Sequence, residues 1–181
     1  YSMSLTRRMQ DEREFVMCTF LPVVFHCGHN STVLPALLAG GTMVLGRKPD
    51  PVGLARAITD ERATAVWAGS PAWVQKLADI ALEDAGGTDL SSLTVAMFSW
   101  GAMNPDMQED LERACGPQVR LLEVFGQTES MSCFRFWPDQ HPEKFAQTFD
   151  GINYVGTPNP LLGADVFDLD GNSLRGQAGV A

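Results

Sequence analysis

The sequence predicts an α/β fold in which a largely parallel sheet carries helices on both faces. Short apolar runs of strand length alternate with segments that repeat apolar residues at helical spacing. Three of the helical segments open with a capping residue followed by proline, and two are closed by paired glycines. Alternation of this kind is typical of βαβ units, whose strands pair in parallel beneath their crossover helices.

Five apolar runs are the predicted strands. They span residues 15–21, 42–45, 65–68, 93–98 and 119–125. Each run is bounded by turn or helix signals and has the length of a strand that is buried in a sheet interior. Because helical segments separate the runs, we expect the strands to lie largely parallel to one another.

Capping residues predict where the helices begin. A side-chain oxygen followed at once by proline suits the first turn, where the proline needs no amide hydrogen. The three such pairs are Asp50-Pro51, Ser70-Pro71 and Asn104-Pro105. A further cap at Asn30-Ser31 predicts a short helix through Leu38, which Gly40-Gly41 would end. Gly86-Gly87 would end the helix that follows Ser70.

The last stretch of the chain changes character. Asp170-Gly171 is a hairpin turn pair, and short apolar segments flank it on both sides. We therefore expect an α/β subdomain at about residues 1–150 and the start of a β-rich segment at 151–181.

Composition excludes several classes of protein. The 181 residues are 45% apolar and 19% charged, which is typical of a globular domain. The net charge of −9 argues against nucleic-acid binding, which requires clustered Lys and Arg. No apolar run approaches the ~20 residues that span a bilayer, and no signal peptide opens the chain. The four cysteines are scattered and lack zinc-site spacing, so we expect reduced thiols in a cytoplasmic protein.

The carboxyl ends of the predicted strands carry glycine, polar and aromatic clusters. These clusters are Phe25-His26-Cys27, Gly69-Ser70-Pro71, Ser99-Trp100-Gly101-Ala102 and Phe125-Gly126-Gln127-Thr128-Glu129. In a parallel sheet these ends share one edge, where open α/β sheets bind ligands. Gly101 allows a flat ring to approach the backbone closely, and Phe125 can cover the other face of such a ring. The alternative is that the clusters are only the turns that βα units require.

Thr128 and Glu129 have two interpretations. A hydroxyl beside a carboxylate offers hard oxygen donors that suit Mg²⁺ carrying a phosphate. The same pair suits the start of a helix, with Thr128 as the N-cap and Glu129 favoured by the helix dipole. Both interpretations stay open at this point.

Several segments follow the motif order of one enzyme family. Leu21 to His29 resembles a Leu-Pro-x-x-His-x-x-Gly segment, and Leu34 to Thr42 resembles the helix and glycine turn that follow it. Ser99-Trp100-Gly101-Ala102 is similar to a Ser-Gly-Gly-Ala adenine loop, and the segment from Phe125 to Glu129 is similar to Tyr-Gly-x-Thr-Glu. Val155 to Pro158 and Asp168 to Gly171 resemble a closing hairpin region. In this order, over nearly the whole chain, the sequence resembles the adenylate-forming (AMP-binding) enzyme superfamily, and within it the acyl-CoA synthetases and fatty-acid–CoA ligases.

The resemblance implies an enzyme that activates a carboxylic acid with ATP to an acyl-adenylate and then transfers the acyl group to a thiol such as coenzyme A. It implies that Thr128 and Glu129 hold the phosphates and Mg²⁺, with Glu129 as the metal ligand. It also implies that His26 lies at the mouth of the acyl pocket, near the carboxylate.

The resemblance assigns further residues to the nucleotide and to the acyl group. The residues implied for the nucleotide are Gly101, Ala102, Phe125, Gly126, Gln127 and Thr128. The residues implied for the acyl pocket are His26, Ser99, Trp100 and Gly101. In two places the sequence departs from the family, because Trp100 stands where glycine is usual and Phe125 replaces a tyrosine.

The family's phosphate loop with its lysine, its ribose-binding aspartate and its carboxy-terminal domain with a catalytic lysine have no counterpart in these residues. We therefore expect an internal piece of the large amino-terminal domain that is inactive alone. Tyr1 to Leu5 is expected to form a helix just past the phosphate loop.

An apolar or aromatic acyl group is favoured by the setting of His26, Trp67, Trp73, Phe98 and Trp100, although these residues also suit an ordinary core.

Two alternatives accompany this hypothesis. An amino-acid-activating adenylation domain would hold its substrate's amino group with an aspartate, and none stands in the strand-end clusters. Outside the enzymes, the fold would serve as a non-catalytic binding or interaction module.

Overall fold

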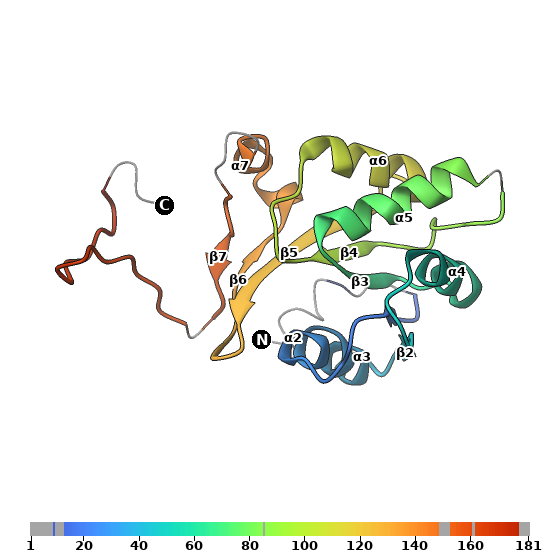
Figure 1. Cartoon of the computed structure of the whole chain (residues 1–181), viewed down its shortest axis with the longest axis horizontal. Coiled ribbons are helices and arrows are strands. Elements are labelled where there is room, and N and C mark those ends of the chain that lie inside the picture. The colour runs from blue at the N-terminus through green and yellow to red at the C-terminus, as the bar shows by residue number, and fades with distance from the viewer. Residues whose placement is uncertain (1–8, 10–12, 85, 149–152, 161, 178–181) are drawn as a thin grey trace.

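A computed structural model describes residues 9, 13–84, 86–148, 153–160 and 162–177. Within this part of the chain one sheet has seven strands in the order β2-β1-β3-β4-β5-β6-β7 (Figure 1). The strands are β1 (Val16–Thr19), β2 (Thr42–Leu45), β3 (Ala65–Gly69), β4 (Val95–Phe98), β5 (Arg120–Gln127), β6 (Ser130–Phe136) and β7 (Thr157–Pro158). The first five pair in parallel, while β6 and β7 pair antiparallel at one edge. The predicted fold class is confirmed.

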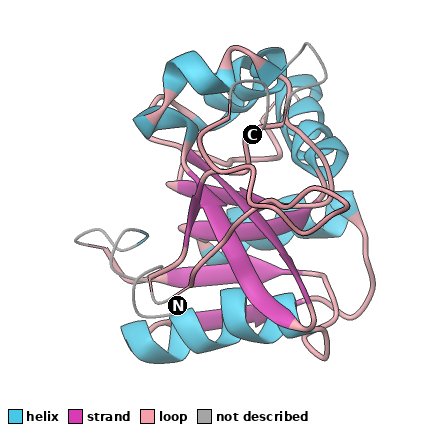
Figure 2. Ribbon diagram, turned by 90° about the vertical axis from the view of Figure 1, so that its left-hand side faces the viewer, coloured by secondary structure: helices cyan, strands magenta, loops and turns pink. Residues whose placement is uncertain are grey.

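Helices cover both faces of the sheet (Figure 2). The helical elements are α2 (His26–Gly28), the π-helical turn η1 (His29–Val33), α3 (Leu34–Ala39), α4 (Pro51–Glu61), α5 (Pro71–Glu83), α6 (Pro105–Cys115), the 3₁₀ turn η2 (Pro138–Gln140) and α7 (Pro142–Phe145). α4, α5 and α6 pack on one face, and α3 packs on the other.

Side-chain alternation along the strands divides the core into two apolar clusters. On β3, Val66 and Ala68 belong to the cluster beneath α4, α5 and α6. Ala65 and Trp67 belong to the cluster on the opposite face. Because strand side chains point to the two faces in turn, one strand serves both clusters.

The predicted helix caps have different outcomes. Asp50 accepts hydrogen bonds from the amides of Val52 (3.2 Å) and Gly53 (3.1 Å), and Asn104 accepts one from Asp106 (2.7 Å). Ser70 also precedes its helix but makes no side-chain capping bond.

The predicted start at Asn30-Ser31 is wrong, because the helical run begins four residues earlier. Phe25 has extended backbone angles and is the N-cap of α2, and its amide donates to the Pro22 carbonyl (3.2 Å). Asn30 lies inside the run, where its side-chain Nδ2 donates to the backbone carbonyl of His26 (3.1 Å). The predicted end is confirmed, since Gly40 adopts φ 65° after α3.

Thr128 and Glu129 do not begin a helix. They form a two-residue turn between β5 and β6, in which Gln127 pairs with Ser130. The pairing register between the two strands shifts between Phe125 and Gln127, so the pairing next to the turn is irregular. The helix-cap interpretation is therefore wrong, because the chain reverses into an antiparallel strand.

Residues 162–177, which follow β7, extend away from the sheet (Figure 1). Their predicted turn is confirmed, because Phe167 and Ser173 form an antiparallel bridge around Asp170-Gly171. The Asp168 carboxylate accepts a hydrogen bond from the Asp170 backbone amide (2.9 Å), which stabilises this turn. The helix predicted for residues 1–5 lies outside the described residues. None of the described helices is long and apolar enough to cross a membrane.

Candidate functional site

A cavity of about 270 Å³ lies at the carboxyl ends of the parallel strands. Its lining comprises Phe25, His26, Cys27, Trp67, Ser99, Trp100, Val124, Gly126, Gln127 and Thr128. Three of the four strand-end clusters therefore meet in one cavity. The fourth, Gly69-Ser70-Pro71, lies beside it, because a Cβ atom on Gly69 would lie 3.2 Å from the Trp100 ring.

Close backbone packing positions His26 at this cavity. A Cβ atom on Gly28 would lie 2.7 Å from the Pro22 carbonyl oxygen and 3.0 Å from Val23 Cα. Only glycine lets the loop from Leu21 cross α2 at this distance. The helical run that starts at His26 continues through the π-helical turn η1, a feature frequent at functional sites. Burial raises the pKa of the neighbouring Cys27 thiol, which is therefore a poor nucleophile.

Trp100 adopts a backbone conformation that ordinarily belongs to glycine. Its φ is 65°, in the left-handed region, where a side chain is disfavoured. Its ring stands edge-on to Trp67, with the centroids 6.5 Å apart and the planes at 86°. The family that the sequence resembles usually has glycine at this position, and glycine adopts such a φ without strain. Here a tryptophan adopts it.

Two buried nitrogen atoms of the lining residues lack a protein partner. His26 Nε2 and Trp67 Nε1 have no hydrogen-bond partner among the described residues. Buried polar atoms are nearly always hydrogen-bonded, so an exception needs an explanation. Both residues border the same cavity, although the two nitrogen atoms themselves have less than 1 Å² of accessible surface.

The turn between β5 and β6 presents Thr128 and Glu129 at the rim. Thr128 lines the cavity, and the Glu129 side chain is exposed beside it. No group of three or more His, Cys, Asp or Glu residues that could hold a metal occurs in the described part of the chain. Mg²⁺ that carries phosphates is usually bound by only one or two carboxylates, so one hydroxyl and one carboxylate fit this ion.

The other predicted site residues lie around the cavity without lining it. Gly101 and Ala102 are exposed, and Gly101 lies next to the Pro71 ring at the start of α5. Phe125 is half exposed and packs against Phe134 of β6, with ring centroids 5.9 Å apart. Phe134 on the neighbouring strand thus packs against the Phe125 ring, which was expected to cover adenine.

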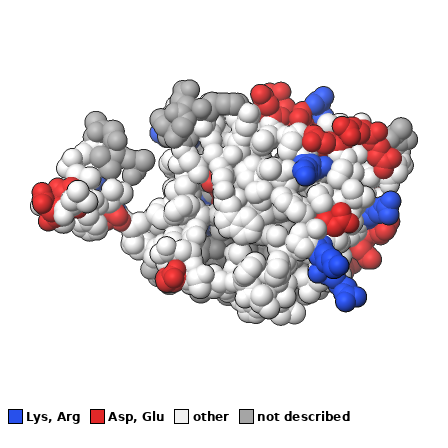
Figure 3. Space-filling model, viewed as in Figure 1, with Lys and Arg blue, Asp and Glu red and all other residues white. Residues whose placement is uncertain are grey.

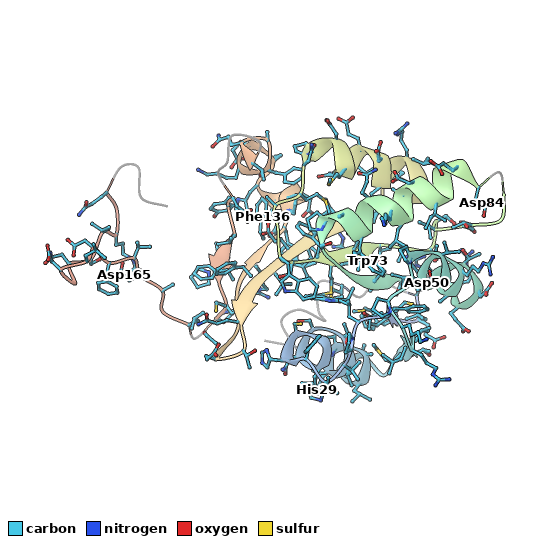
Figure 4. The ribbon with its side chains drawn as sticks, viewed as in Figure 1. His29, Asp50, Trp73, Asp84, Phe136 and Asp165 are labelled. Carbon is cyan, nitrogen blue, oxygen red and sulfur yellow. The ribbon has the colours of Figure 1, made fainter. Side chains whose placement is uncertain are left out.

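Of the aromatic residues expected around an acyl group, only some border the cavity. Trp67 and Trp100 line it. Phe98 is buried in the cluster on the opposite face, and Trp73 of α5 packs against that cluster (Figure 4). These two residues belong to the ordinary core. The sequence pattern did not single out Val124, whose strand position alone indicated burial.

Charged side chains gather away from the strand ends. Figure 3 shows carboxylates over the region of α5 and α6. On α6, Asp110 pairs with Arg113 and accepts a hydrogen bond from Gln75 of α5 (2.8 Å). The Arg113 guanidinium lowers the pKa of the Asp110 carboxyl. This acidic face joins two helices and contributes nothing to the cavity lining.

A family model described as AMP-binding enzyme matches residues 1–180. The structure of amide bond synthetase McbA from Marinactinospora thermotolerans is similar, with a TM-score of 0.71 and 24% identity over 96% of this chain and 33% of that one. A long-chain-fatty-acid-CoA ligase (FadD1) from Archaeoglobus fulgidus also has a TM-score of 0.71, with 19% identity over 96% of this chain and 35% of that one.

O-succinylbenzoate coenzyme A synthetase (MenE) from Bacillus subtilis, in complex with ATP and magnesium ion, has a TM-score of 0.69 and 16% identity over 95% of this chain and 33% of that one. The chain thus spans about a third of the length of these structures. No curated protein matches it. The match of the family model over nearly every residue, together with the shared fold, shows that the chain belongs to the AMP-binding enzyme family.

Proposed function

We propose that this chain is part of an ATP-dependent ligase that activates a carboxylic acid as an acyl-adenylate and then forms an acyl thioester with coenzyme A. The observation that carries the proposal is the single cavity in which the His26 segment, the Ser99-Trp100 segment and the Gly126-to-Thr128 segment meet. An adenylation site must hold a carboxylate and a nucleotide within bonding distance, and one cavity at the strand ends suits that task.

Within this proposal each segment has a role. Thr128 and Glu129 would hold the phosphates together with Mg²⁺, which when bound would offset the charge on the phosphate oxygens. His26 would orient the carboxylate of the acid at the cavity. The exposed face of Phe125 and the backbone at Gly101 and Ala102 would bracket the adenine ring, with Gly126 and Gln127 beside the nucleotide.

Ser99 and Trp100 would border the acyl group. The aromatic lining of the cavity supports an apolar or aromatic acid as the substrate. The four cysteines are free, which supports a cytoplasmic location for the proposed ligase. The start of a β-rich segment at about residue 151 is also part of the proposal, because β7 and the Asp170-Gly171 turn follow the α/β layers.

The alternative functions differ in the compound that receives the acyl group and in the acid that is activated. Names among the similar structures include a coenzyme A ligase, an amide bond synthetase and nonribosomal peptide synthetases. An amino-acid-activating domain would need a partner for the amino group of its substrate. Among the described residues, the cavity lining contains no carboxylate, which favours a simple acid over an amino acid.

ATP–pyrophosphate exchange in the full-length protein tests the proposal. We expect exchange that depends on an apolar or aromatic carboxylic acid, followed by thioester formation when coenzyme A is added. Glu129→Gln should lower the exchange rate by about a hundredfold or more, because a lost metal ligand removes several kcal/mol of transition-state stabilisation. Glu143→Gln, at an exposed carboxylate of α7, is the matched control and should retain full activity.

Three outcomes would contradict parts of the proposal. Exchange with amino acids alone would indicate an adenylation domain for amino acids. Product formation with amines but not with coenzyme A would make the protein an amide-forming ligase. Failure of both ATP and an acyl-adenylate analogue to bind would leave only a non-catalytic module that kept the fold.

A further inference from the structure

The Thr19 hydroxyl joins two backbone groups at the carboxyl end of β1. Thr19 is fully buried, and its hydroxyl donates to the carbonyl oxygen of Trp67 on β3 (3.0 Å). The same hydroxyl oxygen accepts a hydrogen bond from the backbone amide of Leu21 (3.1 Å). A hydroxyl both donates and accepts, so one side chain pairs a carbonyl and an amide of two different segments. The chain thus leaves β1 while it stays tied to β3.

The loop that follows Thr19 leads within a few residues to His26. The hydrogen bond between Thr19 and Leu21 closes a turn of two residues, which sets the direction in which the chain leaves the strand. The Pro22 carbonyl oxygen then accepts the amide of Phe25 (3.2 Å), the residue that caps α2, and packs closely against that helix. Each contact fixes one step of the path from the sheet to His26, and the Thr19 hydroxyl makes the first.

Loss of this hydroxyl would act on the loop more than on the sheet. Valine has nearly the shape of threonine but would leave the Leu21 amide and the Trp67 carbonyl without this partner. A buried polar group that loses its partner is costly, so the freer of the two segments shifts to find another. Trp67 is held within β3, whereas Leu21 lies in a loop. The loop would therefore move, and His26 with it.

We infer that Thr19 is a positioning residue, whose hydroxyl holds the loop of residues 21–25 and thereby sets the place of the His26 imidazole at the cavity. The inference rests on the proposed function, because it takes His26 as the residue that orients the carboxylate of the acid. Thr19 is not among the described residues that line the cavity, so it acts through the loop and not by contact with a substrate.

Thr19→Val in the full-length protein tests the inference. At saturating ATP we expect kcat/KM for the acid in pyrophosphate exchange to fall about tenfold or more, because a displaced orienting residue lowers the fraction of productive complexes. The dissociation constant of ATP with Mg²⁺, measured without the acid, should stay within about twofold of the wild-type value, because the residues proposed for the nucleotide follow β4 and β5. Thr19→Ser keeps the hydroxyl and should restore most of the wild-type kcat/KM.

Thr64→Val is the matched control at the opposite end of the same two strands. The buried Thr64 hydroxyl, just before β3, accepts a hydrogen bond from the backbone amide of Val16 at the start of β1 (3.0 Å). Its loss should lower the stability of the fold, as the loss of the Thr19 hydroxyl does, but should spare kcat/KM for the acid.

Two results would show that the Thr19 hydroxyl only stabilises the fold, and either would overturn the inference. One is a fall in kcat/KM in Thr64→Val as large as that in Thr19→Val. The other is an equal weakening of ATP binding in Thr19→Val. Thr19→Cys, whose thiol is a weaker donor and acceptor, replaces Thr19→Val should that variant not fold. We expect kcat/KM for the acid to fall there too, and an unchanged value would overturn the inference.

The inference and the proposed function fail in distinguishable ways. Activation of an acid with a kcat/KM that Thr19→Val does not change would leave the proposed function standing and overturn the inference. If the wild-type protein activates no acid, the proposed function fails, and the NMR signal of the His26 imidazole, assigned with His26→Gln, decides the inference. A displaced signal in Thr19→Val but not in Thr64→Val would support it, and an unchanged signal in Thr19→Val would overturn it.

Discussion

The Trp100 indole stands edge-on to Trp67 at a centroid distance of 6.5 Å, while its own backbone has a φ of 65°. One residue thus combines a favourable aromatic contact with an unfavourable left-handed conformation. Such a conformation costs about 1–2 kcal/mol, and an aromatic pair contributes about 0.5–1.5 kcal/mol beyond its buried area. Because Trp100 is 64% exposed, its ring buries little apolar area. We therefore expect the cost of the left-handed backbone to exceed the gain from the aromatic contact.

Comparing Trp100→Gly with Trp100→Ala isolates that strain. Both substitutions remove the ring, but only alanine keeps a Cβ atom at positive φ. We expect the glycine variant to have a free energy of unfolding about 1 kcal/mol above that of the alanine variant, measured by urea denaturation. Both variants should also accept bulkier acids, because the cavity loses one wall.

Arg62 offers the matched control, since it has φ 50° at the end of α4, away from the cavity. Arg62→Gly and Arg62→Ala should show the same difference in stability without any change in the acids that are used. An alanine variant at position 100 as stable as the glycine variant would refute the role of strain there.

Glu123 makes the stability of the fold depend on pH. Burial raises the pKa of this β5 carboxyl from its ordinary 4.5 to about 7, and a hydrogen bond from Asn153 (3.2 Å) offsets part of the effect. The folded state therefore holds a proton that the unfolded state has lost between these two values. Stability should fall by up to about 3 kcal/mol as the pH rises from about 4.5 to about 7.

Glu123→Gln should lack this decline and be more stable than the wild type at pH 8. Urea denaturation at a series of pH values measures both proteins, and the difference between their curves isolates Glu123 from other titrating groups. Glu143→Gln, at an exposed carboxylate, should follow the wild-type curve. If Glu123→Gln also follows the wild-type curve at every pH, Glu123 does not titrate with a raised pKa.

Gly28→Ala should displace the segment that carries His26. The new methyl group would meet the Pro22 carbonyl oxygen at 2.7 Å, and both partners are backbone. We expect a loss of about 1–3 kcal/mol in the free energy of unfolding, together with weaker binding of the acid. Gly163→Ala is the control, because a Cβ atom there would meet nothing within 4 Å. Equal stability of the two variants would contradict the close approach.

Two helix starts with the same sequence signal should respond differently to alanine. Asp50→Ala removes a carboxylate that accepts two backbone amides, and should cost about 1 kcal/mol. Ser70→Ala removes a hydroxyl that makes no capping bond, and should change stability by less than about 0.5 kcal/mol. Thermal unfolding of the two variants measures the contrast, and a larger loss at Ser70 would contradict it.

The sequence was sufficient for the parallel strands and their order along the chain, because apolar runs and proline caps are local signals. It was not sufficient for the turn at Thr128-Glu129. A hydroxyl followed by a carboxylate suits the first turn of a helix and the tip of a hairpin equally, and pairing between β5 and β6 decides between them. Whether a capping side chain such as Ser70 bonds its helix likewise depends on its rotamer in the folded protein.

The candidate site was predictable to the extent that strand ends must share an edge. Ser99 and His26 come together for that reason. The place of Trp67 beside the cavity was not predictable in this way. Period-two alternation predicts that the residue is buried, but only the packed sheet shows that its face borders the cavity and that its nitrogen lacks a partner. The left-handed backbone of Trp100 is equally invisible in a list of residues.

The division of the core into two clusters has a consequence for how such a protein changes over time. On β3 the residues that hold α4, α5 and α6 to the sheet alternate with those beside the cavity, so neighbours such as Val66 and Trp67 serve separate purposes. A substitution at Trp67 changes the packing beside the cavity, while the helical layer on the other face keeps its own contacts. The lining of the cavity can therefore change over generations without any change in the contacts that hold α4, α5 and α6 to the sheet.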